Sequence, residues 1–339
     1  MTDRAAAMQR RQLLIATGAA LTAPALAQAQ AGNPLPSWRD GPRRQALLDF
    51  VAAVTTEGSP DFVAPADRIA TFDNDGTLWV EQPAYTQLFF VLDRIRALAP
   101  QHPEWSADAL FRAAIEGDMA ALGAGGTAGL VKLAGAALAG TTPEQFETIA
   151  AEWLATARDG RWHRPFTELV YQPMLEVLAF LRAKGFGTFI VTGGGVEFVR
   201  AFADRTYGVP RSQVVGSTFA LKPGETDGRI TLTREPQIDF VDDGPGKPIG
   251  IARHIGRRPI AAFGNSDGDF QMLQWTKAGK GKTFGLIVHH DDESREYAYD
   301  RKSAIGHLEK GLDEANEMGF VITSMKNDWA TVFPPAGKK

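Results

Sequence analysis

The feature that most constrains the fold is an alternation of short apolar runs with helical patterns along the second half of the chain. Apolar runs bounded by Gly, Pro or polar residues predict buried strands, and apolar residues recurring every three or four positions predict helices. The predicted strands are 68–72, 187–191, 213–221, 259–263, 283–288 and 320–324, with a small β excursion at 229–233 and 238–241. The predicted helices are 44–55, 173–184, 196–205, 248–254, 270–275 and 303–318. This pattern is typical of an α/β fold with three layers, a doubly wound, mostly parallel, Rossmann-like sheet.

The region between the first two predicted strands is different, because it is rich in Ala and Leu at helical spacing and contains no strong strand signal. Thr142 followed by Pro143 predicts a helix start, with a capping side chain and then proline at the first helical position. We therefore expect an inserted α-helical cap domain at 83–171. The α/β catalytic core then comprises 44–82 and 172–339.

The N-terminus predicts a targeting signal at 1–31 rather than folded structure. Arg10 and Arg11 precede an apolar run at 13–26, and small residues follow, as signal peptidase requires. The run is too short to span a bilayer, so no stable membrane anchor is expected. The paired arginines favour the twin-arginine route over an ordinary secretory signal. We expect an exported, periplasmic protein with a linker at 32–43.

Composition narrows the possible functions. The chain has no cysteine, which excludes disulfides, thiolate zinc sites and cysteine nucleophiles. Its 36 Lys and Arg residues nearly balance 40 Asp and Glu residues, so no basic excess indicates nucleic acid or anionic lipid as a partner. A small molecule is the expected partner, and the sequence leaves the oligomeric state open.

Three polar clusters follow predicted strands directly. They are residues 73–77 (Asp-Asn-Asp-Gly-Thr), 192–195 (Thr-Gly-Gly-Gly) and 264–269 (Gly-Asn-Ser-Asp-Gly-Asp). Ligands bind outside the carboxyl ends of the strands in such a sheet, so the fold gathers these clusters at one edge.

The clusters contain the groups that a divalent cation and a phosphate need. Asp73 and Asp75 repel each other unless a cation offsets their charge, and Mg²⁺ prefers a few oxygen ligands with room for water and phosphate. Asp269 is the expected third oxygen donor, with Asn265 or Asp267 as the fourth.

The phosphate itself would lie against the second cluster. Thr192 offers a hydroxyl, and Gly193 with the glycines after it offers backbone N–H groups. Lys247, just before a predicted helix, supplies a fixed positive charge.

These clusters resemble the sequence motifs of the haloacid dehalogenase superfamily. Residues 72–77 resemble its first motif, 191–193 its second, Lys247 its third and 264–269 its fourth, in the family order. Lys222 is the alternative for the third motif. The resemblance extends over about 42–290, and the helical insert is similar to the cap of the phosphoserine-phosphatase-like branch.

The resemblance implies a Mg²⁺-dependent phosphatase that hydrolyses small phosphate monoesters. In it, Asp73 forms an aspartyl-phosphate and Asp75 acts as general acid and then base. Thr192, Gly193 and Lys247 hold the phosphate. The second Asp, two residues after the nucleophile, is implied to mark phosphatases rather than dehalogenases.

The metal ligands implied by the family are Asp73, Asp75, Asp269 and Asn265. Asn265 departs from the acidic residue that many relatives carry at this position, so Asp267 stays open as its replacement.

Other functions remain open at this point. A phosphotransferase or phosphomutase would use the same intermediate, and Asn265 allows an exported binding protein with a decayed site. Residues 264–268 also fit a serine-hydrolase elbow with Asp291 and His307, although too little chain follows for the rest of that fold. The run 289–292 (His-His-Asp-Asp) is a metal cluster or, as we favour, a polar loop.

Three side chains just after the first cluster, Trp79, Glu81 and Tyr85, are candidates to face the substrate because the insert begins beside the site.

Overall fold

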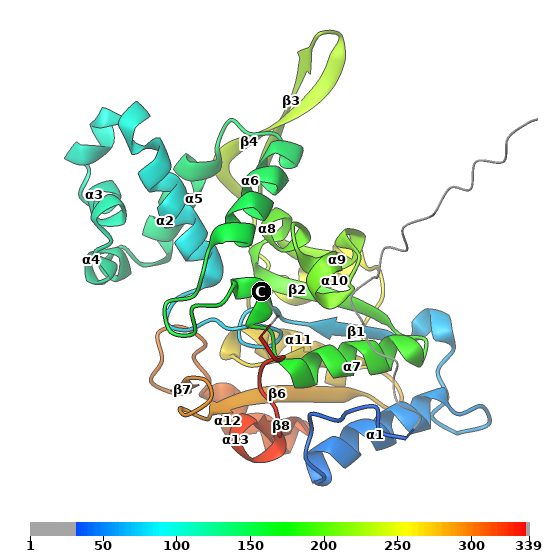
Figure 1. Ribbon diagram of the computed structural model, residues 1–339. Helices are drawn as coiled ribbons and strands as arrows, with labels where there is room; N and C mark the ends of the chain where they lie inside the picture. The colour runs from blue at the N-terminus through cyan, green and yellow to red at the C-terminus, as the bar shows by residue number, and fades with distance from the viewer. Residues whose placement is uncertain (1–31, 337–339) are drawn as a thin grey trace, which may run out of the picture.

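The computed structural model describes residues 32–336, and at its centre lies a sheet of eight strands (Figure 1). Along the main path the strand order is β4-β3-β2-β1-β5-β6-β7, and β8 pairs with β6. The pairs β3–β4 and β6–β7 are antiparallel, and the other pairs are parallel. The strands are β1 (Ile69–Phe72), β2 (Gly187–Gly195), β3 (Val214–Thr226), β4 (Arg229–Phe240), β5 (Ala261–Gly264), β6 (Phe284–Asp291), β7 (Ala298–Tyr299) and β8 (Val321–Ser324).

Thirteen α-helices belong to the described part of the chain. They are α1 (Pro42–Thr55), α2 (Thr86–Leu98), α3 (Ala109–Glu116), α4 (Met119–Ala124), α5 (Gly126–Leu138), α6 (Pro143–Thr156), α7 (Gln172–Ala183), α8 (Val196–Arg200), α9 (Ala203–Tyr207), α10 (Gly246–His254), α11 (Phe270–Lys277), α12 (Lys310–Met318) and α13 (Met325–Asp328).

The core consists of two apolar clusters, one on each face of the sheet. Side chains alternate between the faces along a strand, so Phe263 packs in the larger cluster while its neighbour Ala262 packs in the smaller one. Helices α1, α7 and α8 contribute to the larger cluster, and α10, α11 and α12 to the smaller one. Helices therefore cover both faces of the sheet, and the predicted three-layer α/β fold is confirmed.

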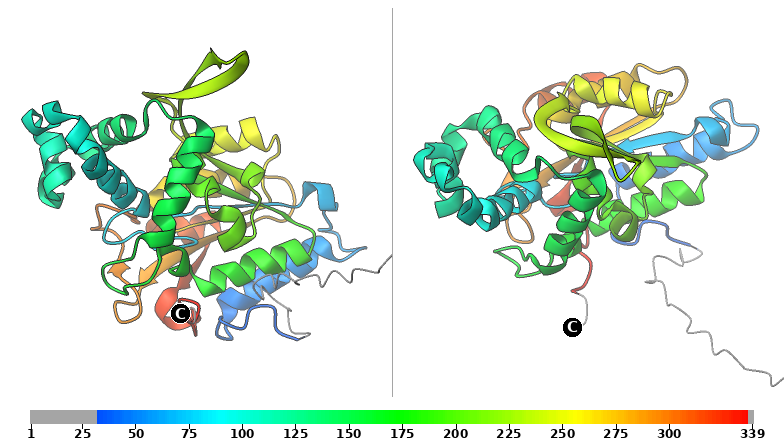
Figure 2. Two further views of the ribbon diagram at one scale, coloured as in Figure 1. Left: turned by 45° about the horizontal axis from the view of Figure 1, so that its top comes forward. Right: turned by 90° about the horizontal axis from the view of Figure 1, so that it is seen from above.

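Helices α2 to α6 lie between β1 and β2 in the chain and stand to one side of the sheet (Figure 2). We call residues 83–171 the helical insert. The predicted start of α6 is confirmed, because Thr142 forms a capping box with Gln145 and Pro143 follows it.

The predicted β excursion is wrong in extent, because β3 and β4 form one long hairpin that projects beyond the sheet (Figure 1). Asp227 and Gly228 form its turn, with φ of 52° and 71°. Positive φ at both central residues matches the twist of the strands and lets the hairpin continue to its tip.

Two predicted helices are also shorter than expected. The predicted helix 196–205 divides into α8 and α9, where buried Phe202 stacks on Trp79 with ring centroids 4.5 Å apart. The predicted helix 303–318 begins only at α12, because Gly306 has a φ of +65° and interrupts the helical path before it.

The segment predicted as a linker at 32–43 packs on the core instead. Leu35 is fully buried, and Trp38 contacts Trp329 edge-on with ring centroids 6.0 Å apart. The Trp38 Nε1 donates a hydrogen bond to the carbonyl of Pro173 at 3.0 Å. These apolar side chains explain why the segment packs on the core. The proline and arginine residues around them led to the prediction of a linker.

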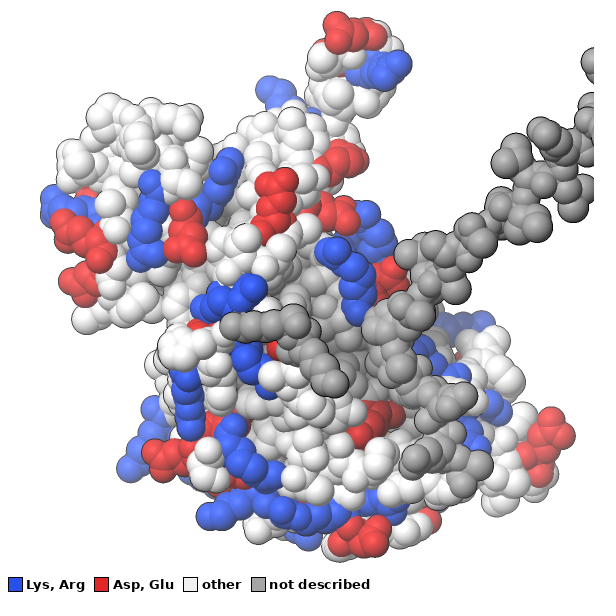
Figure 3. Space-filling model, viewed as in Figure 1, with Lys and Arg blue, Asp and Glu red and all other residues white. Residues whose placement is uncertain are grey.

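The predicted signal at 1–31 lies outside the described residues. Within residues 32–336, no helix has both the length and the apolar character that crossing a membrane requires. Lys and Arg are interspersed with Asp and Glu on the face shown in Figure 3, as the balanced composition predicts.

Candidate functional site

The sheet places the three polar clusters side by side. Strand β1 is central, and Phe72 pairs with Ile190 of β2 on one side and with Phe263 of β5 on the other. Asp73 follows β1 directly, and its amide donates to the carbonyl of Phe263 at 2.9 Å. The clusters that end β1, β2 and β5 are therefore neighbours at one edge, although the chain separates them widely.

Lys247 lies at the centre of this edge, where it joins two carboxylates. Its Nζ donates to Asp73 Oδ1 at 2.6 Å, to Asp269 Oδ1 at 2.6 Å and to the carbonyl of Val191 at 2.9 Å. Burial alone would lower the pKa of Lys247, but the negative charges of Asp269 and Asp73 outweigh burial and raise it. The lysine is therefore a permanent buried cation.

The surroundings of Asp73 shift the pKa of its carboxyl strongly. Burial and the negative charge of Asp269 raise its pKa well above the ordinary value, against the opposing effect of Lys247. Its Oδ1 is held by Lys247, whereas Oδ2 accepts no hydrogen bond from the described residues. One carboxylate oxygen of Asp73 is thus fixed and the other is available.

Asp75 follows in the tight turn of residues 73–77, which we call the Asp73 turn. Its Oδ1 accepts a hydrogen bond from Trp79 Nε1 at 2.9 Å, and its Oδ2 accepts one from Asn74 Nδ2 at 3.4 Å. Burial raises the pKa of Asp75, although these two hydrogen bonds oppose the effect. A carboxyl with a raised pKa keeps its proton to higher pH, which suits a general acid.

Residues 192–195 are the last residues of β2, where the register against β3 shifts between Thr192 and Gly195, and we call them the glycine loop. Thr192 is fully buried, and its Oγ1 accepts from the amide of Gly194 at 3.0 Å. The carbonyl of Gly193 accepts from the Ser217 hydroxyl at 2.8 Å, which anchors the loop on β3. A Cβ at Gly194 would lie 3.7 Å from Asp75 Oδ2, so the glycine loop borders Asp75 directly.

The helical insert reaches the glycine loop through Gln87 of α2. Its Oε1 accepts a hydrogen bond from the amide of Gly195 at 2.8 Å. Sequence reasoning missed this residue, because a single Gln on a helix gives no chemical signal.

Asn265 and Asp269 close the site from the β5 side. Asp269 Oδ2 accepts from the amides of Asn265 and Ser266 at 2.9 and 3.0 Å. The Asn265 side chain accepts from the Thr77 hydroxyl at 3.0 Å and donates to Glu81 Oε1 at 2.6 Å. Asn265 is therefore hydrogen-bonded both to Thr77 in the Asp73 turn and to Glu81 after it.

The three candidates for substrate contact differ in exposure. Trp79 and Glu81 are buried and support site residues, whereas Tyr85 is 37% exposed. Burial raises the pKa of Glu81 well above its ordinary value, and the charges of Asp75 and Asp73 add to this effect. Of the three, only Tyr85 has much surface to offer a substrate.

The two alternative residues lie elsewhere. Lys222 is exposed on the projecting hairpin, opposite Thr233. The Asp267 carboxylate accepts from the amides of Glu309, Lys310 and Gly311 at 3.1, 3.0 and 2.8 Å, so it caps the start of α12.

The carboxylates of the site determine whether it could bind a metal ion. Within residues 32–336, no three His, Asp or Glu side chains form a preassembled metal cluster. Nevertheless, the carboxylates of Asp73 and Asp269 both contact the ammonium of Lys247, and those of Asp75 and Glu81 lie near Asp73. This surplus of negative charge and of oxygen donors fits a hard divalent cation, and without one it would repel an anionic substrate.

A serine-hydrolase triad is absent among the described residues. The Ser266 hydroxyl contacts Asp269, Asp291 binds Ser324, and His307 Nε2 lies 3.8 Å from Asp267. Ser266, His307 and Asp291 therefore each contact other residues and do not form a triad.

The run 289–292 is not a polar loop, because most of it belongs to β6. His290 is buried, and its two ring nitrogens contact Gly76 and Glu296. The run was misread because two histidines and two aspartates conceal the inward–outward alternation of a strand.

Comparisons with known proteins agree with this geometry. The family model of haloacid dehalogenase-like hydrolases matches residues 70–274. No curated protein matches the chain.

Solved structures resemble this chain at low sequence identity, and the first of the following three shares its fold. A functionally unknown protein from Anaerococcus prevotii is 15% identical with a TM-score of 0.55, over 85% of this chain and 94% of its own. A protein of unknown function from Bordetella pertussis is 17% identical with a TM-score of 0.46, over 75% of this chain and 97% of its own. A probable phosphoserine phosphatase from Vibrio cholerae is 14% identical with a TM-score of 0.37, over 73% of this chain and 64% of its own.

Proposed function

Because the chain belongs to the family of haloacid dehalogenase-like hydrolases, we propose that it is a Mg²⁺-dependent phosphatase of small phosphate monoesters. In this proposal Asp73 is the nucleophile, and an aspartyl-phosphate is the intermediate. The predicted signal at 1–31 supports a reaction outside the cytoplasm.

The observation that carries the proposal is the bridge from Lys247 to both Asp73 and Asp269 at 2.6 Å, beside the glycine loop. Lys247 fixes one oxygen of Asp73 and leaves the other without a hydrogen bond from the described residues, while the glycine loop borders Asp75. Phosphoryl transfer depends mainly on such positioning and on charge stabilisation.

The reaction then has two steps. Asp73 Oδ2 attacks phosphorus, the ester P–O bond breaks, and the leaving oxygen takes the proton of Asp75. Water next attacks the phosphorus of the aspartyl-phosphate and gives a proton to Asp75, which releases inorganic phosphate and restores Asp73. The Thr192 hydroxyl and the Gly193 backbone hold the phosphoryl oxygens, and the positive charge of Lys247 stabilises them.

Asp73, the carbonyl of Asp75, Asp269 and Asn265 are the groups that would hold Mg²⁺, which supplies charge neutralisation to the phosphoryl group when bound. Asn265 Oδ1 accepts one hydrogen bond, from Thr77, and has a second lone pair that could bind a cation.

The test uses protein lacking residues 1–31. Phosphate release is measured from p-nitrophenyl phosphate and from a panel of natural monoesters, with Mg²⁺ or with EDTA. The Asp73→Asn variant is compared with Asp49→Asn, a remote exposed site on α1.

We expect Mg²⁺-dependent release that Asp49→Asn retains and Asp73→Asn loses by at least ~10³-fold. Release that is insensitive to EDTA, or that Asp73→Asn retains, would refute the mechanism. Substrate consumption only when an acceptor alcohol is added would instead indicate a phosphotransferase.

A further inference from the structure

His290, near the end of β6, contacts the Asp73 turn. The turn is tight: the carbonyl of Asn74 accepts from the amides of Thr77 and Leu78 at 3.2 and 2.8 Å. Gly76 has a φ of +76°, and its carbonyl faces His290 Nε2 at 2.7 Å. The position of the peptide between Gly76 and Thr77 is therefore set partly by a side chain of β6.

The hydrogen-bond partners of His290 determine where protons lie. A carbonyl can only accept, so Nε2 must carry a proton and donate to Gly76. Nδ1 lies 3.0 Å from Glu296 Oε2. A second proton must therefore lie between Nδ1 and that carboxyl. His290 and Glu296 thus share this proton, and Nε2 is held as the donor.

The pair is buried and is enclosed by two tyrosines. The side chains of His290 and Glu296 are 1% and 0% exposed. The Tyr299 ring stacks on His290 with centroids 4.3 Å apart, and the Tyr171 hydroxyl donates to Glu296 Oε1 at 3.4 Å. The ring therefore has little freedom to leave the Gly76 carbonyl.

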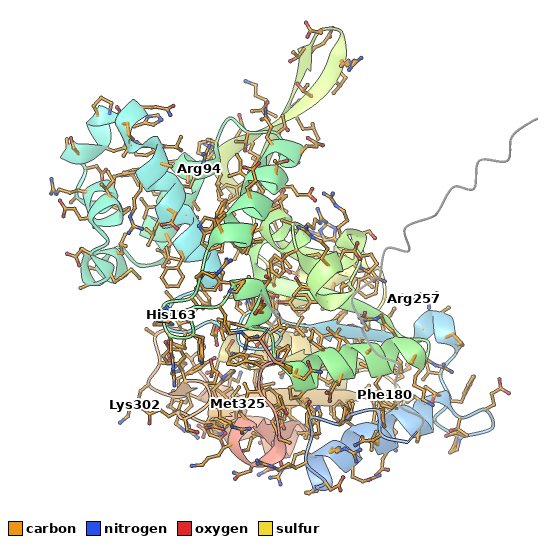
Figure 4. The ribbon with its side chains drawn as sticks, in the orientation of Figure 1. Arg94, His163, Phe180, Arg257, Lys302 and Met325 are labelled. Carbon is orange, nitrogen blue, oxygen red and sulfur yellow. The ribbon has the colours of Figure 1, made fainter. Side chains whose placement is uncertain are left out.

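The same segment also supports Asn265. The Tyr299 hydroxyl donates to Glu81 Oε1 at 2.8 Å, and Glu81 accepts from Asn265 at 2.6 Å. A Cβ at Gly306 would lie 2.1 Å from Glu81 Oε1, so the loop after β7 packs tightly on this carboxyl. Figure 4 shows Lys302 on that loop, at the end of the sheet where the helical insert stands.

Buried ionic and polar groups contribute little net stability compared with apolar residues of the same volume, so stability alone does not account for this network. Its contacts converge on the Asp73 turn and on Asn265.

We propose that His290, held by Glu296, is a positioning residue that orients the Asp73 turn and thereby Asp75. The inference rests on the proposed phosphatase function for its kinetic part only, because the contact itself can be tested in protein without substrate.

The experiment compares His290→Gln with His290→Asn. A glutamine amide nitrogen reaches the position of Nε2 and can still donate to Gly76, whereas the shorter asparagine reaches only the position of Nδ1. The two variants differ by one methylene, so their effects on folding should be similar. His289→Asn is the control, because His289 contacts Asp300 on the outside of the strand.

We expect kcat to fall about 100-fold in His290→Asn, as a misplaced catalytic group predicts. His290→Gln should stay within about tenfold of wild type, and the affinity for inorganic phosphate should change less than about threefold in both variants. In substrate-free protein, the amides of Thr77 and Leu78 should exchange hydrogen faster in His290→Asn only.

Equal loss of kcat in the Asn and Gln variants, or unchanged amide exchange in His290→Asn, would overturn the inference. If wild-type protein releases no phosphate, the proposed function fails, yet amide exchange still decides whether His290 holds the turn.

Discussion

We call Lys247 and the polar clusters at the ends of β1, β2 and β5 the base of the site. The base and the helical insert differ in how firmly hydrogen bonds hold their residues in place. At the base, Lys247, Asn265 and Asp269 are buried, and all three are hydrogen-bonded. The insert touches the glycine loop through one hydrogen bond, from the amide of Gly195 to Gln87. We infer that the base holds the groups common to every substrate, while the insert meets the part that differs. Changes at the base should therefore abolish turnover, and changes in the insert should alter selectivity.

The largest expected effect at the base comes from Lys247→Ala. Removing the ammonium leaves Asp73 and Asp269 buried without their shared partner, which typically costs about 3–5 kcal/mol of unfolding free energy. Phosphate release should fall at least ~10³-fold, because the phosphoryl charge loses its fixed cation. Chemical denaturation and steady-state kinetics measure the two effects.

Lys222→Ala is the matched control, since Lys222 is exposed on the hairpin. It should retain wild-type activity and stability. The opposite ranking of the two lysines would show that the hairpin, rather than the base, supplies the phosphate-binding charge.

Asp75→Asn should reduce kcat by ~10²–10⁴, the usual contribution of a general acid and base. The amide can still accept from Trp79, so the turn should keep its shape. The loss should be smaller for p-nitrophenyl phosphate, whose leaving group needs no proton, than for an alkyl monoester. Equal losses on both substrates would argue against the role of Asp75 as an acid.

The titration of the buried Asp242 carboxyl should make the stability of the protein depend on pH. It is fully buried near Lys247, and neither carboxylate oxygen has a hydrogen-bond partner among the described residues. Burial raises its pKa to about 7. The folded protein then binds a proton that the unfolded chain loses above about pH 4, so unfolding free energy falls as pH rises from about 4 to 7.

Asp242→Asn removes this penalty. Relative to wild type, its unfolding free energy should rise by roughly 2–4 kcal/mol between pH 4 and pH 8, from about 1.4 kcal/mol per pKa unit. Denaturation at several pH values measures it, with exposed Asp49→Asn on α1 as the control. A constant difference between variant and wild type across this pH range would contradict the prediction.

The base was predictable from sequence because its chemistry is encoded locally. Each cluster follows a short apolar strand, and parallel strands bring their carboxyl ends together whatever lies between them. Asp73, Thr192 and Asn265 could thus be grouped without knowing any distance. The choice of Lys247 over Lys222 rested on its place at the start of the predicted helix before the 264–269 cluster, and the structure has Lys247 in the first turn of α10.

The supporting residues could not be predicted in this way. Gln87 meets the glycine loop across 108 residues of chain and lies in no recognisable pattern. Glu81 was expected to face the substrate, and its bond to Asn265 across 184 residues was not foreseen. His290 was visible as an unusual residue, but its partner Gly76 is 214 residues away. The length of the hairpin was missed because exposed strands lack the apolar alternation that marks a buried one.

The smallest expected effect belongs to the insert, at Gln87→Ala. The variant frees the Gly195 amide, which is partly buried and can find water, so unfolding free energy should change by no more than about 1 kcal/mol. The kcat for p-nitrophenyl phosphate should stay within about threefold of wild type, since no group at the base moves. The ranking of natural monoesters should shift, because α2 lies over the glycine loop where the leaving group departs. Steady-state kcat/KM across the panel measures the shift. A uniform loss of kcat for every substrate would place Gln87 with the base and remove the distinction between the two regions.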